Sequence, residues 1–178
     1  MASQFSSDAS IDAFGLLGLP ARFDTDARTL EAAFFERSKE LHPDRFATAP
    51  APERVAALSR SRALNDAYQL LKRETSRAEY LLARAGHVIA DNERLDPTLV
   101  MELLEQREEL QLQRQANNLV EVERLCAAMR TRRRTTLDTV KAGFAHAPPD
   151  YPAIKQQLIL LRYIERYLEE CDAALDEE

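Results

Sequence analysis

The stretch LHPDRF, residues 41–46, decides how the first half of this chain folds. Pro43 cannot continue a helix, because its ring fixes φ and its nitrogen carries no hydrogen to donate. Proline also pushes the preceding residue away from helical geometry, so we expect a helix to end near His42. Apolar residues at helical spacing lie on both sides, over 27–41 and 52–71. The sequence therefore predicts two amphipathic helices joined at a stiff corner.

Local sequence also predicts where the helices around this corner begin and end. The residues DTD at 24–26 are good N-cap types for the first helix, and Pro52 suits the first turn of the second. A short helix near 11–17 should end at the turn-forming residues GLP, 18–20. A further helical segment over 77–85 should end at Gly86. The second amphipathic helix is expected to bury a stripe made of Val55, Leu58, Leu64, Ala67, Tyr68 and Leu71.

The second half of the chain contains three long helical patterns, over 98–115, 118–142 and 151–175. Gly143 is expected to end the second pattern, and short loops join the three. Long helices with short connections favour an antiparallel three-helix bundle. No segment has the alternation of a strand. We therefore predict an all-α fold, with a first domain over 11–75, a connecting helix and linker over 76–97, and a three-helix bundle over 98–175.

Scarce residue types argue against an enzyme. The 178 residues include only 4 glycines, and no glycine-rich nucleotide-binding loop can be built from them. The 3 histidines lie far apart, and Cys126 and Cys171 are each solitary, so we expect no metal, no cofactor and no catalytic centre. No apolar run approaches the length that spans a membrane, and no export signal is recognised. Two cysteines expected as free thiols favour a reducing, cytoplasmic setting.

Charge is distributed unevenly along the chain. Residues 1–85 carry 12 basic and 12 acidic side chains, whereas residues 86–178 carry 12 and 18, which accounts for the net charge of −6. The basic cluster of Arg130 and residues 132–134 therefore lies in an acidic half. It could serve as a nucleic-acid patch or as salt-bridge partners of neighbouring helices. The acidic surroundings favour salt bridges, and we expect no nucleic-acid partner.

The corner itself is a candidate binding site. A proline-fixed turn presents His42 and Asp44 on a rigid support, so little entropy is lost when a partner docks. The Asp44 carboxylate can accept a bidentate hydrogen bond from a partner arginine. The alternative is that HPD only stops a helix, as chance tripeptides of this kind do.

Helix 98–115 has two different apolar faces at about 100° per residue. Leu99, Leu103 and Leu110 form one stripe, which is all that a simple bundle requires. The second face must meet another surface, either the first domain of this chain or a separate protein. It mixes apolar and acidic residues, namely Val100, Met101, Leu104, Glu105 and Glu108.

Together these motifs resemble a known family. The segments FGLLGLP (14–20), LHPDRF (41–46) and LNDAY (64–68) resemble a J-domain, the module through which co-chaperones recruit an ATP-driven heat-shock chaperone. In the second half, the resemblance narrows to the bacterial form of the HscB family, which serves iron–sulfur cluster assembly. It rests on RAEYLL (77–82), MELLE (101–105), REEL (107–110) and LRY (161–163).

The resemblance implies two protein partners. The ATPase of an HscA-type chaperone would be contacted by His42, Pro43 and Asp44. The encounter would be steered by a basic face of Arg37, Lys39 and Arg45. An IscU-type iron–sulfur scaffold would be bound by Val100, Met101, Leu104, Glu105, Glu108 and Tyr163.

Three positions depart from the family pattern in the scaffold-binding region. Val100 and Tyr163 stand where the family often has Leu and Phe, and Leu112 replaces a polar residue one turn beyond Glu108. There are two alternatives to an HscB-family co-chaperone. One is a J-domain protein with a different client, and the other is a purely structural helical adaptor.

Overall fold

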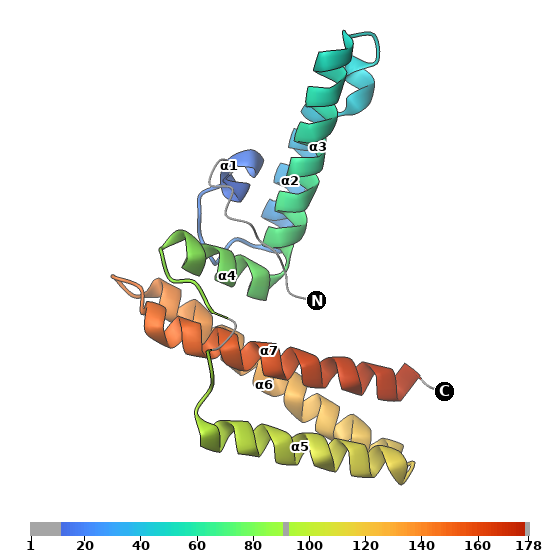
Figure 1. Ribbon diagram of the computed structural model, residues 1–178, viewed down its shortest axis with the longest axis vertical. Helices are drawn as coiled ribbons and strands as arrows, with labels where there is room; N and C mark the ends of the chain where they lie inside the picture. The colour runs from blue at the N-terminus through green and yellow to red at the C-terminus, as the bar shows by residue number, and fades with distance from the viewer. Residues whose placement is uncertain (1–11, 91–92, 177–178) are drawn as a thin grey trace. The chain divides into compact units, whose positions relative to one another are not determined.

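Every regular element in the computed structural model is helical, within the residues it describes, 12–90 and 93–176. The all-α prediction is therefore confirmed for this part of the chain. The chain divides into two compact units, with the boundary between Leu81 and Leu82. The elements, drawn in Figure 1, are α1 (Ala13–Leu17), α2 (Ala27–Leu41), the 3-10 helix η1 (Pro43–Phe46), α3 (Ala51–Lys72), α4 (Glu74–Arg84), α5 (Pro97–Gln115), α6 (Leu119–Ala145) and α7 (Tyr151–Asp176).

In the first unit, α2 and α3 form a long antiparallel hairpin, and α1 packs against α3 (Figure 1). The Asp26 carboxylate caps α2 as the sequence predicts, by accepting a hydrogen bond from the Thr29 amide at 2.9 Å. Phe34 and Tyr68 stack across the hairpin with ring centroids 4.4 Å apart. The fully buried core of this unit includes Phe14, Leu30, Leu64 and Leu71.

The apolar stripe of α3 is shorter than predicted. Val55 and Leu58 are 68% and 62% exposed, so their assignment to the core was wrong. The buried side of α3 is defined by Ala57, Leu64 and Leu71, which are spaced by seven residues. At about 100° per residue, Leu58 lies about 100° and Val55 about 160° around the helix from Ala57, so both point away from the buried side.

Helix α4 is tied to α1 and α3 by two polar side chains. The Tyr80 hydroxyl accepts from the Ala13 amide and donates to the Asp12 carboxylate, each at 3.0 Å. Arg77 is buried, donates to the Leu71 carbonyl at 3.0 Å, and lies 5.3 Å from the centre of the Phe23 ring. Burial lowers the pKa of this guanidinium. The RAEY segment therefore has a clear structural role within the first unit.

In the second unit, α6 and α7 run antiparallel along their whole length, and α5 lies beside them (Figure 1). The predicted three-helix bundle is present. Helix α5 contributes only Leu103 and Leu110 to the buried core, far fewer than either other helix. The fully buried large side chains of this unit outside α4 are Leu110, Val122, Val140, Ile154, Leu158, Leu161 and Ile164.

The segment before α5 is held against the bundle. Gly86 adopts a left-handed conformation with φ of 86°, which ends α4 as predicted. His87 stacks on Tyr151, with ring centroids 4.5 Å apart. Lys155 forms an ion pair with Glu93, and this hydrogen bond lowers the pKa of the Glu93 carboxyl. The described part of the predicted linker is therefore fastened to the start of α7.

Gly143 does not end α6, contrary to the prediction, because the helix continues to Ala145. The residue has a packing role instead. A Cβ atom added at Gly143 would lie 2.7 Å from Cγ1 of Ile154, whose side chain is fully buried. Glycine here allows α6 and α7 to approach closely near the turn of their hairpin.

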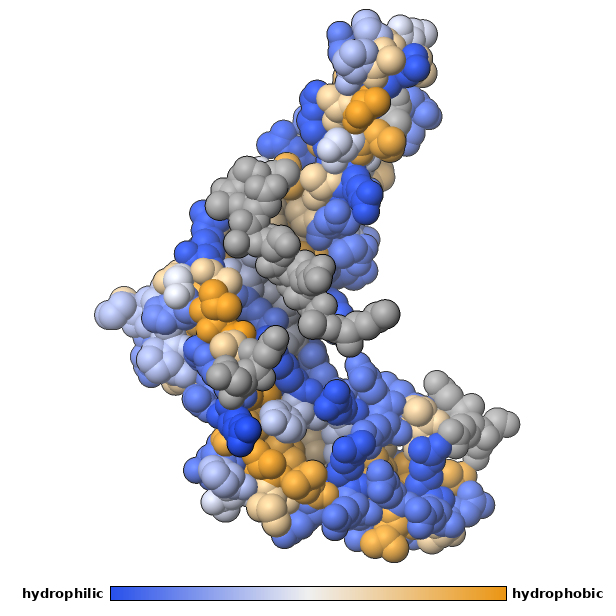
Figure 2. Space-filling view, viewed as in Figure 1, coloured by the Kyte–Doolittle hydropathy of each residue, from blue (hydrophilic) through white to orange (hydrophobic). Residues whose placement is uncertain are grey.

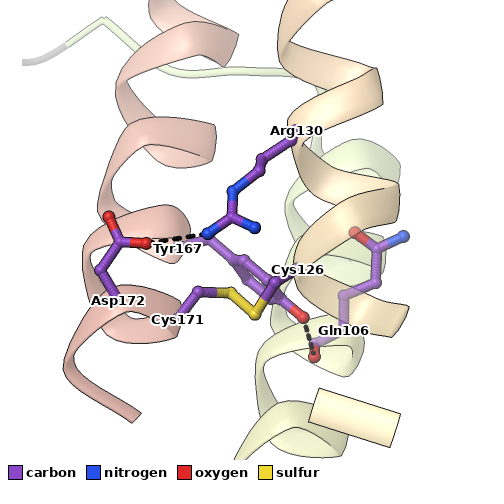
Figure 3. The surroundings of a disulfide bond; sticks show 6 residues. All are labelled: Gln106, Cys126, Arg130, Tyr167, Cys171 and Asp172. Carbon is purple, nitrogen blue, oxygen red and sulfur yellow. Dashed lines mark hydrogen bonds and ion pairs between the residues drawn. A yellow bond between two sulfur atoms is a disulfide. The ribbon is translucent and has the colours of Figure 1, made fainter. Parts of the chain in front are cut away.

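The expectation of two free thiols was also wrong. Cys126 of α6 and Cys171 of α7 form a disulfide, with Cα atoms 5.8 Å apart (Figure 3). Cys171 was expected near a frayed terminus, but its side chain is fully buried. Its position follows from the antiparallel register, since equal numbers of residues separate Cys126 from Gly143 and Ile154 from Cys171. The two cysteines therefore face each other across α6 and α7, as Gly143 and Ile154 do nearer the turn.

We expect Gly143→Val to destabilise the protein by about 2 kcal/mol, because the added atoms overlap Ile154 in a packed core. Ala142→Val adds a similar side chain on the exposed neighbouring position and should cost less than about 0.5 kcal/mol. Denaturant unfolding of both variants measures the difference. Equal free energies of unfolding would contradict the packing role of Gly143.

Candidate partner-binding surfaces

The HPD corner is built by the end of α2 and by η1. His42 leaves helical geometry with ψ of 129°, as the following proline predicts. The chain then turns back at once, because the Arg45 amide donates to the His42 carbonyl at 3.0 Å. The corner is therefore a closed turn that displays two polar side chains.

His42 and Asp44 also contact each other. His42 Nδ1 lies 3.3 Å from the Asp44 amide nitrogen and 3.5 Å from a carboxylate oxygen of the same residue. A neutral imidazole accepts from the amide, whereas a protonated one can donate to the carboxylate. The two side chains remain 57% and 91% exposed, so both are available to a partner.

The basic residues near the corner are exposed, but two of them already have acidic partners. Arg37 pairs with Glu40 at 3.1 Å, and Lys39 pairs with Glu36 at 2.8 Å. The Arg45 guanidinium donates to the carbonyl of Lys39 at 3.4 Å. The predicted basic face is present, and its electrostatic field is reduced by the two glutamates.

The second predicted face, on α5, is exposed as its helical angles indicate. Met101 is 57% and Leu104 46% exposed, whereas Leu103 between them is buried. Glu105 and Glu108 are exposed and Val100 is half-buried. Figure 2 shows apolar side chains, in orange, over α5 and over the end of the α2–α3 hairpin. Helix α5 therefore carries an outward face, the α5 face, which we define as Val100, Met101, Leu104, Glu105 and Glu108. Of these, Val100 lies at its inner edge, where it packs against the bundle core.

Tyr163 of α7 lies at the level of this α5 face. Tyr167 of α7 donates from its hydroxyl to the carbonyl of Gln106 on α5 at 3.4 Å. Helices α5 and α7 run in the same direction, so Tyr163, one turn before Tyr167, is level with the turn of α5 before Gln106 (Figure 1). That turn carries Leu104 and Glu105, and Met101 lies just before it. Tyr163 is 40% exposed.

Polar side chains hold α5 on the bundle, and sequence patterns did not identify most of them. Arg132 of α6 reaches Glu102 at 2.8 Å and Gln106 at 3.2 Å. Arg107 of α5 pairs with Glu170 of α7, and this bond raises the pKa of the guanidinium. These contacts involve Glu102, Gln106 and Arg107, which lie at the edges of α5. They do not involve Met101, Leu104, Glu105 or Glu108 on its outward side.

Tyr167 contributes to this polar attachment as a hydrogen-bond donor. Burial raises the pKa of its phenol, and nearby carboxylates add to the effect. The hydroxyl therefore stays protonated and able to donate to Gln106.

Three arginines of the basic cluster form ion pairs, as the sequence analysis favoured. Besides Arg132, Arg130 pairs with Asp172 at 3.0 Å and Arg133 pairs with Glu165 at 3.3 Å. Across residues 12–90 and 93–176, no group of three or more potential ligands is arranged to hold a metal ion. None of the helices in these ranges is both long and apolar enough to cross a membrane.

Comparison with known proteins defines the class. The HSCB C-terminal oligomerisation domain matches residues 95–172. A protein of Azoarcus sp. (strain BH72), described as "Co-chaperone protein HscB homolog", is 36% identical over 174 residues, covering 95% of this chain and 96% of its own. A homologue of Vibrio campbellii with the same description is 45% identical over 100 residues, and that match spans 58% of its length.

Solved structures agree with this class. Chaperone HscB from Vibrio cholerae matches with a TM-score of 0.83 and 31% identity, covering 94% of this chain and 99% of its own. Human co-chaperone protein HscB shares the fold, with a TM-score of 0.82, 23% identity, and coverage of 94% and 84%. The chain is thus a J-domain protein with a C-terminal helical bundle. It belongs to the HscB family of co-chaperones.

We expect Leu103→Ala and Leu104→Ala to differ sharply in stability, although the residues are adjacent. Leu103→Ala removes buried side-chain atoms and should cost about 2–5 kcal/mol. Leu104→Ala changes an outward residue and should stay within about 0.5 kcal/mol of the parent. Chemical unfolding measures both, and equal losses would show that the outward face of α5 is part of the core.

Proposed function

We propose that this protein stimulates the ATPase of an HscA-type chaperone through its first unit and presents an IscU-type iron–sulfur scaffold on its second. The observation that carries the proposal is the pairing of two exposed surfaces in one HscB-family chain. One is the HPD corner, and the other is the α5 face with Tyr163.

The corner suits a docking role on physical grounds. Its backbone is fixed by Pro43 and by the turn from Arg45 to His42, so a partner need not order it. The Asp44 carboxylate is almost fully exposed, and a carboxylate on a rigid support is a good acceptor for an arginine fork. The neighbouring Arg37, Lys39 and Arg45 would steer the corner toward an acidic surface on the chaperone.

The α5 face suits a protein client. Its centre offers Met101 and Leu104, and Met can adapt its shape to a partner. Glu105 and Glu108 supply a charged rim, the arrangement typical of an interface in which a few central residues carry most of the free energy of binding. Val100 and Tyr163 differ from the usual family residues and would alter the fit without removing the apolar character.

The proposed role is regulatory and non-enzymatic, because the ATP hydrolysed is bound by the partner chaperone. A cytoplasmic location belongs to the proposal, since an ATP-dependent partner needs the ATP pool of the cell interior. A J-domain protein with another client would use the same corner to contact its chaperone. The two roles differ in whether the α5 face binds an IscU-type scaffold.

We expect His42→Gln to abolish stimulation of the HscA-type ATPase, because the corner loses its imidazole while the backbone is unchanged. His146→Gln, at an exposed histidine after α6, is the matched control and should stimulate normally. Steady-state ATP hydrolysis measures both, with circular dichroism to establish that the fold is retained. Stimulation by His42→Gln at the parent level would contradict the role of the corner.

We expect the double variant Met101→Ala, Leu104→Ala to weaken binding of an IscU-type scaffold by about 2 kcal/mol or more, roughly thirtyfold. Val120→Ala removes a more exposed apolar side chain from α6 and should bind normally. Titration calorimetry with purified scaffold measures both. Unchanged affinity of the double variant would show that the client is different or binds elsewhere.

A further inference from the structure

The disulfide between Cys126 and Cys171 has no part in the function proposed above. Both side chains are fully buried, and the cysteines lie 45 residues apart in the sequence. The 5.8 Å between their Cα atoms is within the usual range for a disulfide. A reduced cysteine packs as a small apolar residue. The core around this pair can therefore accommodate either the bond or two thiols.

The bond lies where all three bundle helices are fastened together (Figure 3). Tyr167, one turn before Cys171, donates to the Gln106 carbonyl on α5. Glu170, next to Cys171 on α7, pairs with Arg107 of α5. One turn after Cys126, Arg130 pairs with Asp172 across α6 and α7. The disulfide is thus the one covalent bond among several weak contacts in this layer.

This layer is connected to the α5 face through one side of α7. Tyr163, Tyr167 and Cys171 are spaced by four residues, so they lie one above another on the same side of the helix. Tyr163 is level with the outward face of α5, and Tyr167 contacts α5 directly. Leu103 and Leu110 of α5 are buried, and Leu99 and Val100 are only partly buried against the core, so the position of α5 also depends on such contacts.

We propose that Cys126 and Cys171 are a reversible redox pair, in which oxidation fixes α7 to α6 behind the α5 face and reduction loosens α5. The effect on scaffold binding and the reducing setting rest on the proposed function, whereas the effect of the bond on α5 does not. Disulfides in reducing compartments are usually transient and redox-sensing. A disulfide in a protein proposed to work in the cytoplasm fits that pattern.

The oxidant is a small-molecule disulfide of the glutathione class. One cysteine thiolate attacks it, forming a mixed disulfide and releasing one glutathione thiolate. The second cysteine thiolate then attacks the mixed disulfide, so the Cys126–Cys171 bond forms and a second glutathione leaves. The protein loses two electrons and two protons, and the oxidant is reduced to two thiols.

Access to the buried pair is provided by the end of α7. Cys171 lies in the last two turns of this helix, which ends at Asp176. Terminal turns open more readily than the centre of a helix, because they have fewer neighbours. Opening of these turns exposes Cys171 without unfolding the bundle, so exchange should be slow but complete.

The test uses the full chain equilibrated in glutathione buffers from fully reduced to fully oxidised, followed by alkylation and mass spectrometry. We expect two free thiols in the fully reduced buffer and none in the fully oxidised buffer, and we expect the change to be reversible. The oxidised form should melt about 10 °C higher, because the bond restricts the unfolded chain. Its α5 amides should exchange hydrogen at least fivefold more slowly. The double variant Cys126→Ala, Cys171→Ala is the control, because it can form neither the bond nor a mixed disulfide, and its melting temperature and hydrogen exchange should be the same in every buffer.

Two outcomes would overturn the proposal. The thiols could stay free in every glutathione buffer, or the bond could form while hydrogen exchange in α5 is unchanged. Calorimetry with an IscU-type scaffold then tests the functional step. We expect three- to tenfold tighter binding by the oxidised form, and equal affinities would contradict control of the α5 face. Absence of binding by both forms would refute the proposed function, and hydrogen exchange would still decide the redox proposal.

Discussion

The break that Pro43 imposes on α2 is the constraint on which the first unit depends. Without an amide hydrogen at residue 43 and with φ fixed, the helix cannot pass Leu41. The chain turns at once, and the turn displays His42 and Asp44 instead of burying them. One residue thus determines both where α2 ends and the display of these two side chains.

In the second unit, an uneven division of buried surface leaves the α5 face exposed. Helices α6 and α7 pack closely along their length, helped by the small Gly143, and need little from α5. Helix α5 is attached by Leu103, Leu110 and polar contacts along its edges. Its outward side is then free to carry Met101 and Leu104. A partly buried helix can offer a partner apolar surface that a fully packed helix would have used.

The sequence predicted what depends on local chemistry. The Asp26 cap, the end of α2 before Pro43, and the two faces of α5 all follow from residues within a few positions of one another. The errors concern distant partners. Val55 is exposed, Gly143 lies inside α6, and Cys126 is bonded to Cys171. Each depends on which side of a helix faces its partner across a hairpin, formed by α2 and α3 for Val55 and by α6 and α7 for Gly143 and the two cysteines.

The most direct test of the co-chaperone role asks whether both surfaces must act on the same molecule. Linked sites are effective because binding at one raises the local concentration of the other partner. His42→Gln and the Met101→Ala, Leu104→Ala variant should therefore be mixed with an HscA-type chaperone and an IscU-type scaffold, and ATP hydrolysis measured. We expect scaffold to raise ATP hydrolysis further with the parent protein and to add nothing with the mixture. Full recovery in the mixture would contradict delivery by a single chain.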